Sequence, residues 1–325
     1  MLLSLSGYIG PVGDILDPMH RIFHCPGAAL RALSFFACAV LAGCIRPPEP
    51  GSLTFAVWGD TPYTRYEREV ALDMLAEQAA RPLAFSLHVG DLKGGSAPCD
   101  DAVFADRRQL LERSAHPLVL LAGDNDWLDC RRAAAGGFDP FERLTHLRGT
   151  MFGDGRLDGA LRPAVQPGVP EHRRWRMQGV VFVTLNVAGG KLPDDPRADA
   201  LRTAARDWLD AAFDEAERTT APAIVIAFHA SPDFAAGGRS PRYGWLLGRI
   251  AARAASASRP VLLVHGDTHL HRADHPLRHP DNGTVLSHVM RIESHGTPWL
   301  GWAEVELRPG QAAPFRVTPH PYRRD

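Results

Sequence analysis

Five short apolar segments of this 325-residue chain end in a side chain that can bind a metal ion or transfer a proton. These side chains are, in chain order, Asp60, Asp91, Asp124, His229 and Asp267. Glycine directly precedes each aspartate, and glycine allows a tight turn and a close approach of the backbone to a ligand. One aspartate after a strand often caps the next helix, but five such residues in order are hard to explain as caps. Carboxylates and imidazoles bind divalent cations, so the pattern indicates metal-dependent chemistry.

The segments that carry these residues read as strands buried on both faces, because they are short apolar runs rich in Val, Ile and Leu. They cover residues 53–58, 83–89, 118–122, 223–228 and 261–264. Apolar residues at three- and four-residue spacing predict intervening helices over 68–80, 103–113, 200–218 and 243–255. This alternation of strand and helix predicts an α/β fold. Ligands of such folds gather at the carboxyl ends of the strands, where the five residues stand.

The remaining parts of the chain are less regular. Two runs, 285–291 and 301–307, predict strands without a helix between them, and residues 136–172 are rich in glycine and read as loop. No linker divides residues 53–320, so we expect them to form one catalytic domain.

The composition excludes several classes of protein. The chain has 36 basic and 37 acidic residues, which argues against a general electrostatic attraction to nucleic acid. The sequence has no basic and aromatic platform for single strands, and no Gly-x-Ser-x-Gly elbow, P-loop or Gly-x-Gly-x-x-Gly fingerprint. No uninterrupted apolar run reaches about 18 residues, which excludes a protein with several membrane spans.

The order and spacing of the five segments resemble those of the calcineurin-like metallophosphoesterases, hydrolases of phosphoric esters that use two metal ions. The family motifs are Asp-x-His, Gly-Asp, Gly-Asn-His-(Glu/Asp), an isolated His and Gly-His-x-His. The corresponding stretches here are Gly59-Asp60-Thr61-Pro62, Gly90-Asp91, Gly123-Asp124-Asn125-Asp126, His229 and Gly266-Asp267-Thr268-His269. The resemblance spans residues 53–307 and implies a four-layer α/β/β/α sandwich with the metal site at the carboxyl ends of the strands.

The resemblance also implies which residues hold two divalent ions. The first ion would be bound by Asp60, Asp91 and His269, and the second by Asp91, Asp124, His229 and Asp267. A water or hydroxide between the ions would attack phosphorus in line. A phosphoric ester is therefore the implied substrate.

Several positions depart from the family motifs. Pro62 stands where the first motif has a histidine, so the first ion loses an imidazole ligand. Asp124 and Asp267 replace an amide and an imidazole by carboxylates. Asn125 stands at the catalytic histidine of the family, and an amide donates a hydrogen bond but cannot act as an acid near neutral pH. Asp126, which ends this motif, is the other candidate catalytic residue.

The four aspartates would together balance the charge of two divalent ions. Such a hard centre favours Mn²⁺ or Mg²⁺, with Fe, Zn²⁺ or Ca²⁺ as alternatives. The added negative charge repels anionic substrates, so we expect a phosphodiester rather than a monoester. The losses at Pro62 and Asn125 favour a second hypothesis, a catalytically impaired binding or scaffold protein that keeps the fold at the cell envelope.

Two further residues could meet the substrate. Tyr63 follows the first motif and could form a wall of the pocket, although core packing explains it equally well. Arg291 follows a predicted strand near the last motif and could bind a phosphate. The alternative for Arg291 is an ion pair with Glu293.

The start of the chain indicates export. A short apolar run over residues 32–42 follows Arg31, as in secretion signals. Its ending, Leu41-Ala42-Gly43-Cys44, resembles a bacterial lipobox, in which the cysteine is acylated. An ordinary signal peptide and a buried helix are the alternatives.

We therefore expect a signal peptide over residues 1–44, with Met19 as a start of ordinary length, and a proline-rich tether over 45–52. This predicts an exported lipoprotein that faces the periplasm or the cell exterior. Its only contact with the membrane would be the lipid on Cys44.

Cys99 and Cys130 are the two cysteines that remain once the signal is removed. An oxidising compartment allows such a pair to form a disulfide. Both lie in loops that follow neighbouring predicted strand ends, after Asp91 and Asp124 respectively. We therefore expect a Cys99–Cys130 disulfide, with two unpaired buried thiols as the alternative.

Overall fold

The computed structural model describes residues 51–323, which contain twelve strands and five α-helices. The predicted signal peptide, Cys44 and most of the predicted tether lie outside the described residues. Within residues 51–323, no helix combines the length and the apolar character that a membrane span requires.

The first sheet has five strands in the order β12-β11-β1-β2-β3. Their bounds are β1 (Leu53–Trp58), β2 (Ser86–His88), β3 (Leu118–Leu120), β11 (Gly301–Leu307) and β12 (Phe315–Pro321). β1, β2 and β3 are parallel, whereas β11 and β12 run antiparallel at the edge. Parallel pairing places the carboxyl ends of β1, β2 and β3 at the same edge of the sheet.

The second sheet has seven strands in the order β4-β5-β6-β7-β8-β10-β9. Their bounds are β4 (Ala164–Gln166), β5 (Val169–Met177), β6 (Val180–Leu185), β7 (Ile224–Phe228), β8 (Val261–His265), β9 (Arg272–Asp274) and β10 (Val289–Glu293). β6, β7, β8 and β10 form its parallel centre, flanked by antiparallel pairs. The carboxyl ends of β7 and β8 therefore also share one edge.

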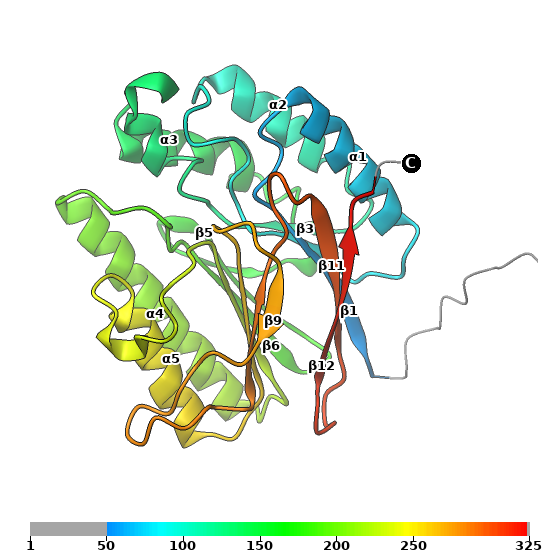
Figure 1. Ribbon diagram of the computed structural model, residues 1–325, viewed down its shortest axis with the longest axis vertical. Coiled ribbons are helices and arrows are strands. Elements are labelled where there is room, and N and C mark those ends of the chain that lie inside the picture. Colours follow the sequence, from blue (N-terminus) through cyan, green and yellow to red (C-terminus); the bar gives the residue numbers. More distant parts are fainter. Residues whose placement is uncertain (1–50, 324–325) are drawn as a thin grey trace, which may run out of the picture. The chain divides into compact units, whose positions relative to one another are not determined.

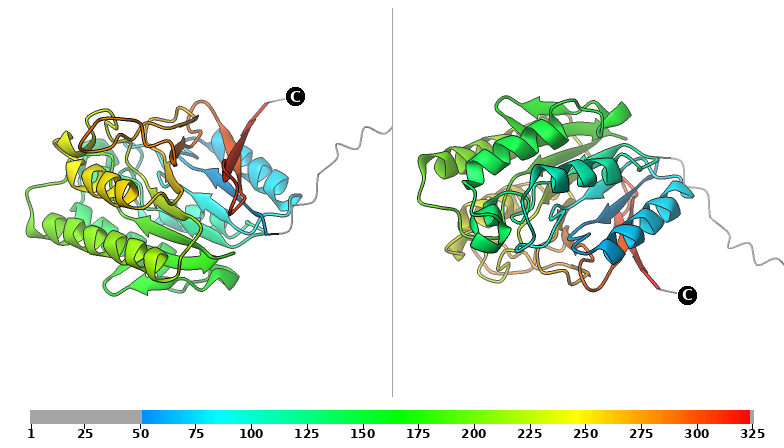
Figure 2. Two further views of the ribbon diagram at one scale, coloured as in Figure 1. Left: turned by 90° about the horizontal axis from the view of Figure 1, so that it is seen from below. Right: turned by 90° about the horizontal axis from the view of Figure 1, so that it is seen from above.

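The two sheets pack against each other through an apolar cluster from both, in which Phe55 and Phe85 contact Phe182 edge to face. The helices are α1 (Arg65–Ala79), α2 (Asp101–Leu111), α3 (Pro140–Leu147), α4 (Pro196–Arg218) and α5 (Gly244–Ser256). A second cluster joins α1, α2 and α3 to the first sheet, and a third joins α4 and α5 to the second. Figure 1 shows α1 with α2 and α4 with α5 on opposite sides of the strands, and Figure 2 shows this from two other directions.

The predicted α/β class is confirmed, and the four predicted helices correspond to α1, α2, α4 and α5. The prediction of loop over residues 136–172 is wrong in part, because α3, β4 and the start of β5 lie there. The strand predicted over 285–291 is displaced, since β10 covers Val289–Glu293. β6 is an additional parallel strand that the pattern of ligand-type strand ends does not mark, because asparagine follows it.

Candidate metal centre

The six predicted ligand residues lie together, next to the carboxyl ends of strands from both sheets. Asp60, Asp91 and Asp124 follow strands of the first sheet, and His229, Asp267 and His269 follow strands of the second. The ligand atoms of Asp60, Asp91 and His229 all lie within 4.8 Å of one another, and so do those of Asp124, His229 and Asp267. Two adjoining groups therefore share His229.

His229 is fully buried at the centre of these groups. Its Nδ1 lies 2.8 Å from the carbonyl oxygen of Val89, which can only accept, so we assign the proton of the neutral ring to Nδ1. Its Nε2 lies 3.3 Å from Oδ1 of Asp91, 3.4 Å from Oδ1 of Asp124 and 3.9 Å from Oδ1 of Asp267. The lone pair of a neutral imidazole thus faces three carboxylates, an arrangement that either a proton on Nε2 or a bound cation stabilises.

The charges around His229 also favour a positive charge at Nε2. Burial by itself lowers the pKa of His229, but the carboxylates, Asp91 foremost, raise this pKa well above its ordinary value. Positive charge at Nε2 is therefore strongly favoured, and a divalent ion supplies more of it than a proton.

Asp60 supplies a second buried atom without a partner. Its Oδ1 accepts a hydrogen bond from the backbone N–H of Asp267 at 3.1 Å, whereas its Oδ2 has no hydrogen-bond partner. Burial raises the pKa of Asp60 to about 7. Nε2 of His269 lies 3.7 Å from Oδ1 of Asp60, and the Nδ1 of His269 is bonded to the carbonyl of Thr297. Buried polar atoms are rarely left unpaired, so the open atoms of Asp60 and His229 fit metal ligands.

The backbone at these positions is unusual. Asp60, Asp91, Asp267 and His269 have φ values of 50°, 58°, 82° and 66°, in the left-handed region that disfavours residues other than glycine. Such conformations are retained where the surrounding structure holds them, often at functional sites. The neighbouring Gly123 is required for close packing, since a Cβ there would lie 2.1 Å from Oδ1 of Asp91.

Asp126, a predicted catalytic residue, accepts hydrogen bonds from three backbone N–H groups. It is fully buried, and its Oδ2 accepts hydrogen bonds from the backbone N–H groups of Asp91 at 2.9 Å and Gly123 at 2.8 Å. Its Oδ1 accepts from the backbone N–H of Leu92 at 2.7 Å. Both oxygens are thus engaged in holding the second and third ligand loops together, and we interpret Asp126 as a positioning residue.

Tyr63 and Asn125 line the side of the centre that holds Asp91 and His269. The Tyr63 hydroxyl donates to Oδ2 of Asp91 at 3.1 Å, accepts from Nδ2 of Asn125 at 3.2 Å and lies 3.3 Å from Nε2 of His269. Asn125 also donates through Nδ2 to Oδ2 of Asp91 at 2.6 Å. Burial and the carboxylate of Asp91 raise the pKa of Tyr63, so this hydroxyl is neutral. The phenol therefore reaches the ligand cluster, and Tyr63 directly follows Pro62, which stands where the resembled motif has a histidine.

Arg291 is paired with Asp274 and not with Glu293, the alternative partner. Its guanidinium donates from Nε to Oδ1 and from Nη2 to Oδ2 of Asp274, at 2.7 and 2.5 Å, and lies over the ring of Phe234. Glu293 is paired instead with Arg272, at 2.8 Å. Both bonds to Asp274 would have to break before Arg291 could bind a phosphate in the same way, and this ion pair joins β10 to β9.

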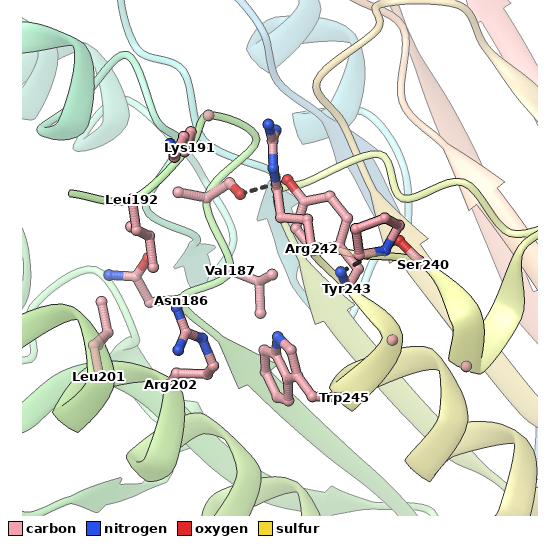
Figure 3. A pocket seen from close by; sticks show the side chains of 15 residues that line it. Asn186, Val187, Lys191, Leu192, Leu201, Arg202, Ser240, Arg242, Tyr243 and Trp245 are labelled. Atoms are coloured by element: carbon pink, nitrogen blue, oxygen red, sulfur yellow. Dashed lines mark hydrogen bonds between the residues drawn. The ribbon is translucent and has the colours of Figure 1, made fainter. Parts of the chain in front are cut away.

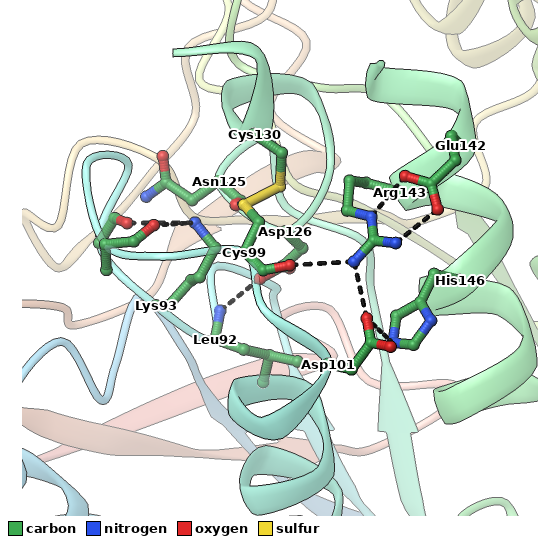
Figure 4. Close-up of a disulfide and its surroundings, with 12 residues drawn as sticks. Leu92, Lys93, Cys99, Asp101, Asn125, Asp126, Cys130, Glu142, Arg143 and His146 are labelled. Carbon is green, nitrogen blue, oxygen red and sulfur yellow. Dashed lines mark hydrogen bonds and ion pairs between the residues drawn. A yellow bond between two sulfur atoms is a disulfide. The ribbon is translucent and has the colours of Figure 1, made fainter. Parts of the chain in front are cut away.

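The predicted disulfide is confirmed. Cys99 and Cys130 are bonded, with their Cα atoms 5.6 Å apart, and both side chains are fully buried (Figure 4). The bridge connects the loop after β2 to the short 3₁₀ helix η1 (Leu128–Arg131) that follows the third ligand loop. Arg143 of α3 donates to the carbonyl of Cys99 at 3.1 Å. The disulfide therefore limits how far these two loops can separate.

The loop after β6 also contacts the cluster, although its residues are absent from the predicted site. A Cβ on Gly189 would lie 2.2 Å from Oδ1 of Asp267, and one on Gly190 would lie 3.2 Å from Oδ2 of Asp124. The hydroxyl of Tyr243 donates to the carbonyl of Gly189 at 2.7 Å and fixes this loop. The signal in the sequence is a pair of glycines shortly after an apolar run.

Comparison with solved structures finds this fold elsewhere. A dimetal phosphatase from Danio rerio is similar with a TM-score of 0.57 at 12% identity, covering 83% of this chain and 96% of that chain. PhoD is similar with a TM-score of 0.52 at 15% identity, covering 81% of this chain and 64% of that chain. No protein-family profile and no curated protein matches the sequence. At these identities the likeness concerns the fold alone, and the chain shares the fold of a dimetal phosphatase, as the motifs imply.

Proposed function

We propose that this protein is a metal-dependent hydrolase of phosphoric esters that prefers phosphodiesters. The observation that carries the proposal is the buried Nε2 of His229, which faces three carboxylates and has no hydrogen-bond partner. The shared fold with a dimetal phosphatase supports the same reaction class.

The two groups of ligand atoms fit two divalent ions. One group consists of Asp60, Asp91 and His229, and the other of Asp124, His229 and Asp267. His269, whose Nε2 lies 3.7 Å from Oδ1 of Asp60, would add a ligand to the first ion, and Asp91 would lie between the two ions. Bound divalent ions would activate water and neutralise the charge that develops on the phosphoryl group. The donors are mainly carboxylate oxygens, which favours Mn²⁺ or Mg²⁺ over softer ions.

The chain's own residues explain the preference for a diester. Four carboxylates surround the centre and leave little net positive charge for a doubly charged monoester. Asn125 donates to Asp91 and Tyr63 and cannot supply a proton to the leaving group. Substrates whose leaving group departs unprotonated should therefore react best.

The second hypothesis, an impaired binding protein, also has an observation in its favour. The Tyr63 hydroxyl contacts both Asp91 and His269, so this part of the cluster is held together by the chain itself. A centre with one ion, or with very slow turnover, would follow from that contact.

Metal binding and hydrolysis separate the two hypotheses. The protein is stripped with a chelator, loaded separately with Mn²⁺, Mg²⁺, Ca²⁺ and Zn²⁺, and assayed on bis(4-nitrophenyl) phosphate and 4-nitrophenyl phosphate. We expect metal-dependent hydrolysis with the diester favoured, and its loss in Asp91→Ala. The matched control is Asp129→Asn, a buried carboxylate of the same region that is paired with Arg132. Hydrolysis that persists in Asp91→Ala would contradict the two-ion arrangement, and metal binding without any hydrolysis would favour the binding protein.

We also propose that the protein is exported and held to a membrane by a lipid on Cys44. The Cys99–Cys130 disulfide supports an oxidising compartment. In a bacterial host, Cys44→Ser should move the protein to the soluble exported fraction or leave the precursor unprocessed. Normal processing and membrane retention of this variant would count against lipidation.

A further inference from the structure

A pocket of about 610 Å³ lies between the loop after β6, the first turns of α4 and the segment that leads into α5. Figure 3 shows Leu192, Leu201 and Arg202 on one side of it and Arg242 and Trp245 on the other. Its volume is in the range that holds an organic ligand of moderate size. None of the predicted metal ligands lines it.

The pocket shares a wall with the metal centre. Gly190 lines the pocket, and a Cβ on this residue would lie 3.2 Å from Oδ2 of Asp124. The wall is fixed from the pocket side, because Nη1 of Arg242 donates to the carbonyl of Gly189 at 2.9 Å and the Tyr243 hydroxyl donates to that of Ala188 at 2.9 Å. A phosphoric ester at the carboxylates could thus extend its organic part over Gly190 into the pocket.

The lining combines positive charge with apolar surface. Lys191, Arg202 and Arg242 line the pocket, and no aspartate or glutamate does. Arg202 is paired with Asp199 at 2.7 Å, whereas within residues 51–323 neither Lys191 nor Arg242 forms an ion pair. The apolar part consists of Val187, Leu192, Leu201 and Trp245. This lining suits a ligand that has an apolar or aromatic body and a negative charge.

We propose that this pocket binds the organic part of the substrate, and that this part carries an anionic group in addition to the scissile phosphate and an apolar or aromatic body. The proposal rests on the proposed hydrolase function for the identity of the ligand as a phosphoric ester. The positive side chains bind the second anion, and Trp245 packs against the body. The metal centre and the pocket together then select an extended ester over a small one.

The binding test uses two fluorescent probes of similar shape. Anilinonaphthalene sulfonate carries a negative charge, and N-phenylnaphthylamine is its uncharged counterpart. We expect Trp245→Ala to weaken both probes about tenfold, because it removes an aromatic contact surface. Lys191→Gln should weaken only the sulfonate, by about threefold, the size expected for one partly exposed charge.

Arg218→Gln is the matched control. Arg218 is an exposed arginine in the last turn of α4, the helix whose first turns line the pocket, so it changes the net charge equally. The control should bind both probes as the unaltered protein does. Circular dichroism and the unfolding midpoint establish that each variant is folded. The proposal would be overturned if the unaltered protein, Trp245→Ala and Lys191→Gln bound the sulfonate equally. It would also be overturned if the unaltered protein bound neither probe.

Kinetics then test the substrate class. Two 4-nitrophenyl phosphodiesters are compared, one with a methyl group and one with a carboxynaphthyl group as the second ester. We expect kcat/KM to favour the carboxynaphthyl diester about tenfold, and Trp245→Ala to reduce this preference, whereas Arg218→Gln keeps it. If neither diester is hydrolysed while the pocket variants still alter probe binding, the hydrolase assignment fails and the pocket stands. Hydrolysis of both diesters without preference would reject the pocket as a substrate site.

Discussion

Replacing Asp126 by asparagine tests whether this residue positions the ligand loops or acts on the substrate. The carboxylate accepts three backbone N–H groups, from Asp91, Leu92 and Gly123, at 2.7–2.9 Å. An asparagine of the same shape can turn its carbonyl oxygen to the two donors shared by Oδ2. Its amide N–H₂ then faces the N–H of Leu92, which loses its acceptor inside the protein.

The expected cost follows from that geometry. One buried donor left without a partner costs about 1–3 kcal/mol, so Asp126→Asn should lower the free energy of unfolding by that amount. Asp126→Ala leaves three donors without a partner and should cost more, roughly 4 kcal/mol, towards the upper end for single substitutions. Because two of these donors belong to Asp91 and Gly123, we also expect the affinity for Mn²⁺ to fall about tenfold or more, the range seen when groups that orient metal ligands are removed.

Denaturant unfolding of the metal-free protein measures the stability term, and calorimetric titration with Mn²⁺ measures the affinity. Asp129→Asn provides the control, since this carboxylate lies in the same region and pairs with Arg132 rather than with the ligand loops. It should lose some stability but retain its Mn²⁺ affinity. If Asp126→Asn keeps both stability and affinity and loses only kcat, then the side chain acts on the substrate and the positioning role is refuted.

Three further predictions concern the rest of the described chain. Replacing Cys99 by alanine and Cys130 by serine should lower the free energy of unfolding by roughly 3–4 kcal/mol, given a separation of 31 residues, and equal unfolding midpoints would contradict this. Burial lowers the pKa of His172 to about 4, below its unfolded value near 6.5. The buried neutral ring therefore contributes its full stability above pH 6.5. As the pH falls from 6.5 towards 4, the free energy of unfolding should decrease on the order of 3 kcal/mol. Unfolding measured at several pH values should show a flatter dependence in this window for His172→Asn; an unchanged slope would reject the assignment. Asn125→His should speed the hydrolysis of alkyl esters relative to aryl esters in the metal-loaded protein, and an unchanged ratio of their kcat/KM values would show that the absent acid does not limit the rate.

Two independent features of the sequence predict each parallel strand that carries a ligand. One is a short apolar run, and the other is a ligand-type residue shortly after it. The run 261–264, for example, is apolar throughout and is followed at once by His265-Gly266-Asp267, and β8 forms there. β6 has an equally apolar run, but Asn186 follows it instead of a carboxylate or an imidazole, so the pattern of strand ends does not mark it. α3 is short, and its apolar residues Phe141, Leu144 and Leu147 lie between the glycines at 136–137 and those from 149 onwards.

The sequence shows which residues have the types and the order of metal ligands. It does not show what each of these side chains contacts. Asp124 and Asp126 have the same chemistry two positions apart, yet Asp124 points to His229 while Asp126 points back to the N–H groups of the neighbouring loop. The difference arises from the path of the turn after β3. Likewise, the spacing around Arg291 suggests Glu293, but the antiparallel register of β10 with β9 places Asp274 opposite Arg291.

The departures from the motifs of the resembled family change the charge and the ligand types of the proposed centre. Replacing a neutral amide and a neutral imidazole by Asp124 and Asp267 adds two carboxylates, while Pro62 and Asn125 remove two imidazoles. The proposed centre would then have harder ligands, no acid at position 125 and less attraction for a dianion. Each change by itself reads as loss of function. Under the proposed function, together they would suit a singly charged ester with a good leaving group, and affinity would come from contacts beyond the phosphate. The cationic and apolar pocket behind Gly190 supplies a surface for such contacts.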